Sequence, residues 1–155
     1  MRLTTYKTRL TENKRITLEK EISVNHPGDG IIRSPENVRE LATGYLRMHE
    51  ESEEYLYMLC LNTKNRVIGV FEISHGNVNS SIFGVREILQ KALLANAVSI
   101  IMLHNHPSGD CSPSREDINV TERLKEASRI VGIELLDHII IGDGTYCSLK
   151  EKGYV

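Results

Sequence analysis

Apolar and polar residues recur along this chain with two spacings, and each spacing predicts one type of element. Alternation with period two, or a short apolar run, predicts a strand, whereas apolar residues three and four apart predict one face of a helix. Strands are predicted at residues 16–24, 55–62, 66–74, 98–103, 133–141 and 145–149. Helices are predicted from Ser34 to about His49, from Val85 to Ala97, and from about Ser114 to Gly132.

Residues that start and stop helices agree with these boundaries. Ser34 is a typical helix cap followed by a proline at the first helical position, and Gly132 is typical of a helix end. Residues 25–30 form a turn cluster, and residues 75–81 read as a Gly/Asn/Ser loop. Helices alternate with strands without a long linker, so the pattern predicts a compact, layered α/β domain. We expect residues 34–155 to form that domain, and residues 1–33 to be an N-terminal arm with a strand, either packed on it or loose.

Length and composition narrow the class of protein. A chain of 155 residues with 40% hydrophobic and 26% charged residues is typical of one soluble globular domain. No apolar run approaches the ~20 residues of a membrane span, and the N-terminus lacks the apolar core of a signal peptide. We therefore expect a cytoplasmic location and no membrane partner. Cys60, Cys111 and Cys147 form no CxxC pair, which favours reduced, structural cysteines.

Charge is distributed unevenly. The net charge is −2, so the chain as a whole lacks the basic signature of a nucleic-acid-binding protein. Residues 1–24, however, carry six Lys or Arg against three Glu, a net charge of +3, which leaves −5 on the remainder. Such a short excess fits a solvated edge or a loose arm, and contact with phosphates is the alternative.

The strongest chemical signal follows the strand at residues 98–103. His104 and His106 are two residues apart at the end of this strand, so their side chains project from the same face. Asp117, one turn into the next helix, can reach back toward them. Three such ligands leave an open coordination position, as catalytic zinc requires. Ser114 and Asp117 also fit a helix capping box, and that interpretation is compatible with the metal site because a cap would hold Asp117 rigidly.

The motif resembles that of a known family. His104-Asn105-His106-Pro107, six residues, and then Ser114-Arg115-Glu116-Asp117 is similar to the H-x-H-P-x(6)-S-x-x-D pattern of the JAMM metalloproteases in the JAB/MPN superfamily, and specifically to its RadC branch. The resemblance extends from about residue 54 to 155. It implies a three-layer α/β/α sandwich with a mixed sheet, similar to cytidine deaminase, and zinc bound by His104, His106 and Asp117 with water in the fourth position.

The resemblance also implies a mechanism. Zinc lowers the pKa of its bound water from ~16 toward ~7, and a carboxylate must then carry the proton to the leaving amine. In the family this is a glutamate upstream of the histidines, and Glu54 fits, although Tyr57 stands where a glycine is common. Glu53 is the competitor shifted by one residue, Glu72 is a weaker third candidate, and strand alternation allows only one of Glu53 and Glu54 to face the metal. Ser114 resembles the serine that hydrogen-bonds the oxyanion of the tetrahedral intermediate.

These features predict a zinc-dependent hydrolase that cleaves a peptide or isopeptide-like amide in a peptide or protein substrate. The alternative is a metal-dependent DNA-processing factor of the RadC family, whose longer members carry an N-terminal region resembling a helix–hairpin–helix module. About fifty residues precede the catalytic-like part here, too few for that module plus the helix at Ser34. The H-x-E…P-C-x-x-C signature of zinc deaminases is absent from the sequence, and a non-catalytic scaffold would have lost ligands that this chain retains. The pair Asp137-His138 fits either support of a ligand histidine or a buried polar pair.

Overall fold

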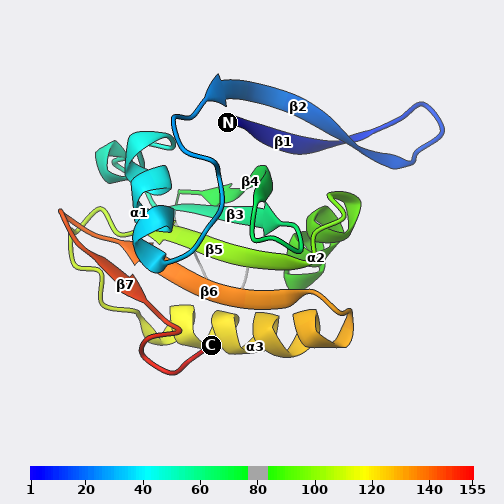
Figure 1. The fold of residues 1–155 in the computed structure, drawn as a ribbon. Coiled ribbons are helices and arrows are strands. Elements are labelled where there is room, and N and C mark those ends of the chain that lie inside the picture. The colour runs from blue at the N-terminus through cyan, green and yellow to red at the C-terminus, as the bar shows by residue number, and fades with distance from the viewer. Residues whose placement is uncertain (77–83) are drawn as a thin grey trace.

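Strands and helices alternate along most of the chain in the computed structural model, which describes residues 1–76 and 84–155 (Figure 1). The elements in chain order are β1 (Arg2–Leu10), β2 (Ile16–Asn25), α1 (Pro35–Gly44), the 3₁₀ helix η1 (Met48–Glu50), β3 (Tyr55–Leu61), β4 (Val67–His75), α2 (Val85–Leu94), β5 (Ser99–Asn105), α3 (Arg115–Ile130), β6 (Glu134–Ile141) and β7 (Tyr146–Ser148).

Within the described residues the strands form one seven-stranded sheet in the order β2-β1-β4-β3-β5-β6-β7. The β1–β4 and β5–β6 pairs are parallel, and the other pairs are antiparallel, so the sheet is mixed. β3 and β5 lie at its centre, and all seven residues of β5 are buried. A strand covered on both faces favours apolar residues at consecutive positions, which explains the apolar run from Ile100 to Leu103 before His104.

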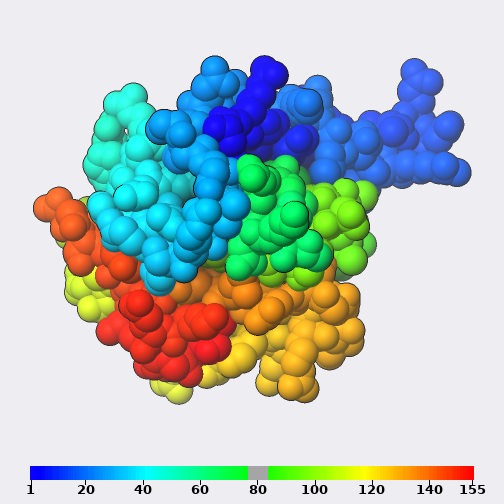
Figure 2. Space-filling view, viewed as in Figure 1, coloured from blue at the N-terminus to red at the C-terminus, as the bar shows by residue number. Residues whose placement is uncertain are grey.

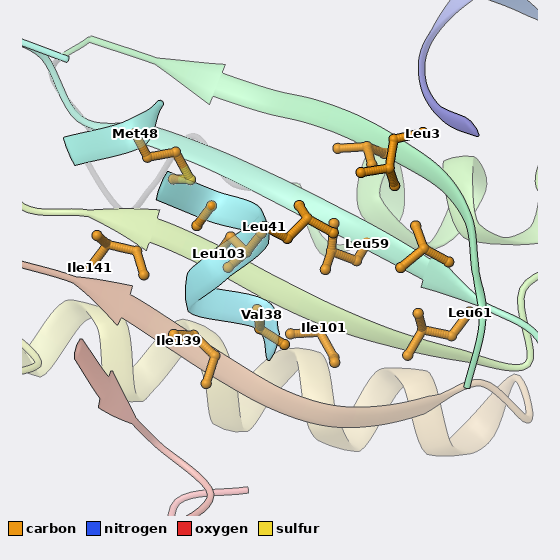
Figure 3. Close-up of a cluster of buried hydrophobic side chains, with 13 residues drawn as sticks. Leu3, Val38, Leu41, Met48, Leu59, Leu61, Ile101, Leu103, Ile139 and Ile141 are labelled. Carbon is orange, nitrogen blue, oxygen red and sulfur yellow. The ribbon is translucent and has the colours of Figure 1, made fainter. Parts of the chain in front are cut away.

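The sheet carries helices on both faces. On one face α1 covers a cluster of buried side chains contributed by alternate strand residues (Figure 3). Val38, Leu41, Leu59, Leu61, Ile101, Leu103, Ile139 and Ile141 are its main members. On the opposite face α2 and α3 cover Leu56, Met58, Cys60, Phe71, Ile100 and Met102. The predicted three-layer α/β sandwich with a mixed sheet is therefore confirmed.

The structure differs from the sequence pattern at β1, for which no strand was predicted, and at two helix ends. The helix predicted to reach His49 ends at Gly44, and Arg47, in the left-handed conformation with φ of 54°, separates it from η1. The helix predicted to reach Ala97 ends at Leu94, and Asn96 is likewise left-handed with φ of 55°. Apolar periodicity continues past both ends because the chain still packs there, although the α-helix itself does not continue. Part of the predicted loop at residues 75–81 lies outside the described residues.

The β1–β2 hairpin extends beyond the body of the domain, as the space-filling view shows (Figure 2). Its base belongs to the sheet, because β1 pairs with β4 and Leu3 is buried in the cluster under α1. Its far end is exposed, with Leu10 at 63% exposure. None of the helices in residues 1–76 and 84–155 is long and apolar enough to cross a membrane.

Candidate metal centre

β5 delivers the first histidine to the face of the sheet that α2 and α3 cover. Side chains of Ile100, Met102 and His104 alternate onto this face, and His104 is 3% exposed. The strand ends at Asn105, so the chain leaves the sheet between the two histidines. Burial of an imidazole is unfavourable unless its ring nitrogens have hydrogen-bonding or metal partners. The two ring nitrogens of His104 therefore need polar groups close by.

His106 lies in the tight turn that follows β5. Its backbone N–H donates to the carbonyl of Ile141, 2.9 Å away, and its ring Nδ1 donates to the carbonyl of Asp110 at 2.7 Å. A carbonyl can only accept, so the proton is on Nδ1, and Nε2 keeps its lone pair when the ring is neutral. A Cβ at Gly142 would lie 2.4 Å from the carbonyl oxygen of Gly109, so only glycine lets the two loops pack this closely.

The start of α3 fixes Asp117. Ser114 caps the helix: its Oγ accepts from the Asp117 N–H at 3.1 Å, and its own N–H donates to Asp117 Oδ2 at 2.7 Å. The predicted capping box is confirmed. The Ser114 hydroxyl also donates to Asp117 Oδ2 at 2.7 Å, so its proton is already engaged. The cap orients the carboxylate toward the two histidines.

These side chains converge. Asp117 Oδ1 lies 3.2 Å from His104 Nδ1, and Asp117 Oδ2 lies 3.5 Å from His106 Nε2. The two imidazole rings are perpendicular, with centroids 4.7 Å apart. Glu54 reaches the cluster from the residue before β3, and its Oε2 lies 3.9 Å from His104 Nε2. One ligand atom each from Glu54, His104 and His106 lies within 4.8 Å of the others, which is close enough for a common metal ion.

Of the three candidate glutamates, only Glu54 joins this cluster among the described residues. Glu53 is exposed and turned away, as alternation along the chain requires, and its carboxylate lies near Gly76. Glu72 is exposed on β4 and pairs with His75 at 2.7 Å. The side chain of Glu54 is 38% exposed, which distinguishes it from the buried Asp117.

The electrostatics of the cluster are dominated by Asp117. Burial raises the pKa of this carboxyl, but its contacts with His104 and His106 outweigh burial and hold the pKa well below its usual range. The Asp117 carboxylate in turn raises the pKa of His106, against the effect of burial. Asp117 is therefore an anion at neutral pH.

His138 supports the cluster from β6, whereas its neighbour Asp137 does not. The His138 ring stacks beside His104 at a centroid distance of 5.9 Å, and its Nδ1 lies 2.7 Å from Thr121 Oγ1. Thr121 donates to the Asp117 carbonyl at 2.6 Å, so His138 Nδ1 must donate to the threonine. Asp137 instead accepts from Ser148 Oγ at 2.6 Å and from the Lys150 N–H at 3.0 Å.

Two supporting residues, Thr121 and Asn105, were missing from the candidates taken from the sequence. Thr121 lies one helical turn after Asp117, which is the only signal the sequence offers for it. Asn105 is a polar residue at the end of an otherwise apolar strand, and it is 2% exposed in the structure. A buried amide needs partners for both its oxygen and its nitrogen, so this position could have been singled out from the strand pattern alone.

Comparison with known proteins shows what this chain is similar to. The model of the RadC-like JAB domain matches residues 32–154. The chain is similar to a UPF0758 protein of Clostridium acetobutylicum, with 53% identity over 79% of this chain and 52% of the relative. It is also 50% identical to a UPF0758 protein of Geobacillus over 90% of this chain and 62% of the relative. A UPF0758 protein of Methanosarcina acetivorans is 52% identical over 80% of this chain and 53% of its own length. The chain thus spans about half the length of the relatives it matches.

Proposed function

Because the chain belongs to the RadC-like JAB domain family, a branch of a metallohydrolase superfamily, we propose that it is a zinc-dependent hydrolase. The bond cleaved would be a peptide or isopeptide-like amide in a peptide or protein substrate. His104, His106 and Asp117 would hold the zinc ion, and Glu54 would act as the base. The residues around the site fit this assignment in two respects.

The observation that carries the proposal is the buried Nε2 of His104, which has no hydrogen-bond partner in the described part of the chain. Its Nδ1 faces Asp117 Oδ1, so Nε2 presents a lone pair toward the cluster with Glu54 and His106. A buried acceptor without a partner costs about 1–3 kcal/mol. A metal ion is a natural partner for such a nitrogen.

The contact between His106 and Asp117 supports the same interpretation. With the His106 proton on Nδ1, its Nε2 and Asp117 Oδ2 are both acceptors, yet they lie 3.5 Å apart. Two acceptors this close need a cation between them, either a second proton or a metal ion. Ligands of tetrahedral zinc at ~2.1 Å are about 3.4 Å from each other, close to the observed separation.

The chain's own residues divide the chemistry between them. Zinc, when bound, supplies a Lewis acid that lowers the pKa of water toward ~7. The partly exposed Glu54 carboxylate accepts a proton from water and passes it to the leaving amine. The Glu54 carboxylate lies beside His104 and makes no hydrogen bond within residues 1–76 and 84–155. It is therefore able to move between the water that gives up the proton and the amine that receives it.

Ser114 is proposed to hydrogen-bond the oxyanion that develops on the substrate carbonyl, a contribution of about 3–4 kcal/mol in other hydrolases. Its hydroxyl donates to Asp117 Oδ2 in this structure. To donate to an oxyanion, the Ser114 hydroxyl must therefore give up its hydrogen bond to Asp117 Oδ2. The serine can still cap α3 during that exchange, because the cap uses its oxygen as an acceptor.

A cavity of about 200 Å³ beside His106 is lined by the turn that follows β5, η1 and the loop after β6. Its lining does not include Glu54, His104, Ser114 or Asp117. Glu51 and Asp143 give this cavity carboxylates.

One observation favours a second candidate function, a metal-dependent DNA-processing factor. The positive charge of residues 1–24 lies on the β1–β2 hairpin, and a two-stranded ribbon has a width that fits the major groove of DNA. Arg9 and Lys7 are paired with Glu19 and Glu21, however, which reduces the charge available to phosphates.

Metal analysis tests the site. We expect about one zinc per chain after purification without chelator, and loss of that zinc in His106→Ala. His49→Ala is a matched control, because His49 is an exposed histidine outside the cluster. Zinc content that stays unchanged in His106→Ala would show that the ligands are assigned wrongly.

Substrate profiling then tests the reaction. Peptide libraries and nucleic acids are incubated with wild-type protein, Glu54→Gln and the neighbouring control Glu53→Gln. We expect peptide cleavage that falls about 100-fold or more in Glu54→Gln and persists in Glu53→Gln. Cleavage of DNA alone, abolished by Glu54→Gln, would establish the second candidate instead.

A further inference from the structure

Asn105 stands between the two histidines and points away from them. Alternation along β5 directs its side chain to the face that α1 covers, where it is 2% exposed. No ligand role is available to it there. Its amide must nevertheless satisfy a donor and an acceptor in a buried position.

The partners of this amide are main-chain groups fifty residues earlier. Asn105 Oδ1 accepts from the Tyr55 N–H at 2.6 Å, and Asn105 Nδ2 donates to the Glu53 carbonyl at 3.0 Å. These two groups belong to the peptide units on either side of Glu54. On the other side, the Glu54 carbonyl accepts from the Gly76 N–H at 2.9 Å.

The sheet explains why a side chain is needed at this point. The β3–β5 ladder ends with the pair Leu56–His104. Beyond that pair β5 continues its pairing with β6 alone, through Asn105–Ile141. Main-chain groups of residues 53 and 55 are thereby left without a partner strand on the β5 side. The Asn105 amide replaces the main-chain hydrogen bonds that β5 no longer supplies. The segment before β3 thus stays bonded to β5 on both sides of Glu54.

The carboxylate of Glu54 depends on this attachment. In the parts of the chain that the structure describes, 1–76 and 84–155, it makes no hydrogen bond, and its one polar contact is His104 Nε2 at 3.9 Å. Its location is therefore set by its main chain. An amide supplies both the acceptor and the donor that the flanking groups require, whereas aspartate lacks the donor and alanine lacks both.

We propose that Asn105 is a positioning residue: by bridging the Tyr55 N–H and the Glu53 carbonyl, it places the Glu54 carboxylate beside the histidine cluster. This inference rests on the proposed function, in which Glu54 is the base. It adds that the residue between the two histidines couples the position of the metal ligands to that of the base.

Amide hydrogen exchange tests the bridge without any substrate or metal. In Asn105→Ala we expect the Tyr55 N–H to exchange about tenfold faster or more, while that of Met58, inside the β3 ladder, keeps its rate. The matched control is Asn62→Ala, because Asn62 follows the other end of β3 and accepts from the N–H groups of Lys64 and Arg66. Unchanged exchange at Tyr55 in Asn105→Ala would overturn the proposal.

Cobalt substitution tests the coupling to Glu54. The probe is the pH midpoint of the visible absorption of the Co²⁺-loaded protein. Asn105→Ala is expected to leave Co²⁺ stoichiometry intact and to shift this midpoint in the same direction as Glu54→Gln, whereas Asn62→Ala does not. The double variant should match Glu54→Gln alone, because Asn105 acts through Glu54.

The outcomes separate this inference from the proposed function. Additive shifts in the double variant, or an equal shift in Asn62→Ala, would overturn the positioning role. Failure of the wild-type protein to bind Co²⁺ would overturn the proposed function and the role of Asn105 within it, while the exchange result would still decide the main-chain bridge.

If Asn105→Ala does not fold, Asn105→Asp replaces it. That variant keeps the acceptor for Tyr55, so slow exchange at Tyr55 with a shifted midpoint is expected, and an unshifted midpoint would count against the proposal.

Discussion

At the scale of single residues, burial decides how reactive each of the three cysteines is. Cys60 and Cys147 are buried, whereas Cys111 is partly exposed in the turn after His106, and all three are free thiols. Burial raises the pKa of the Cys60 thiol to about 12 and raises that of Cys147 as well. Because the thiolate is the reactive form, two of the three thiols should be protected by the fold.

Thiol labelling checks this expectation. A thiol reagent should modify Cys111 alone in the folded protein at pH 8, and all three cysteines after unfolding in guanidinium. Cys111→Ser should abolish the reaction of the native protein. Reaction of Cys60 at the rate of Cys111 would contradict the buried position found for it.

Burial also sets the behaviour of His138 in acid. Desolvation of this fully buried ring, together with the neighbouring His104, lowers its pKa from the ordinary 6.5 to about 3. The unfolded chain therefore takes up a proton below pH 6.5 that the folded protein refuses until about pH 3. By linkage, stability is full above pH 6.5 and falls as the pH drops toward 3.

Denaturant unfolding at several pH values measures this loss. Between pH 7 and pH 5 the chelator-treated wild-type protein should lose about 2 kcal/mol of unfolding free energy more than His138→Gln, at 1.36 kcal/mol per pKa unit. Equal pH profiles for the two proteins would show that His138 is not held neutral.

At the scale of elements, the residues that cap the N-terminus of α3 also belong to the proposed metal site. The Ser114 oxygen accepts from the Asp117 N–H, and the Asp117 carboxylate accepts from the Ser114 N–H. Each bond satisfies a main-chain donor that the first helical turn leaves free. The same carboxylate faces both histidines, so the helix start and the proposed metal site cannot be changed independently.

Substitution at the cap should therefore affect stability and metal binding together. Ser114→Ala is expected to lower the unfolding free energy by about 1 kcal/mol and to weaken zinc binding, because Asp117 Oδ2 loses one of its donors. Ser114→Thr retains the hydroxyl and should stay close to wild type in both measurements. Ser52→Ala, at an exposed serine before β3, is the control. A Ser114→Ala protein as stable as wild type would show that the cap contributes nothing.

For the whole molecule, the main question is whether the N-terminal residues belong to the folding unit. We propose that residues 1–33 fold with the remainder, because β1 lies inside the sheet between β2 and β4. Leu3 is 1% exposed and packs in the cluster under α1, whereas Leu10 at the far end of the hairpin is 63% exposed.

A pair of leucine substitutions tests this arrangement. Leu3→Ala should lower the unfolding free energy by about 2–5 kcal/mol, because it leaves a cavity in the core. Leu10→Ala removes the same atoms from an exposed site and should change it by about 0.5 kcal/mol or less. The comparison uses chemical denaturation of both variants. A Leu3→Ala protein as stable as wild type would show that the hairpin is a loose arm.

Much of the fold could be predicted from the sequence because the apolar periodicity has a direct physical cause. Strands such as β5 and β6 are buried on both faces along most of their length and are therefore rich in consecutive apolar residues, and α3 needs a stripe that faces the sheet. The ends of α1 and α2 could not be predicted this way. Arg47 and Asn96 adopt left-handed backbone angles, and neither residue type signals a helix end as clearly as glycine does.

By itself the sequence determined the alternation of strands and helices and the capping box at Ser114, because each depends on residues close together along the chain. It also singled out His104, His106, Asp117 and Glu54 as candidates. Only the tertiary structure decided that Glu54 rather than Glu53 lies beside His104, and that His138 rather than Asp137 supports the cluster. Those facts depend on which strands are neighbours. The attachment of Asn105 to the main chain around Glu54 spans fifty residues, and only the pairing of β3 with β5 brings them together.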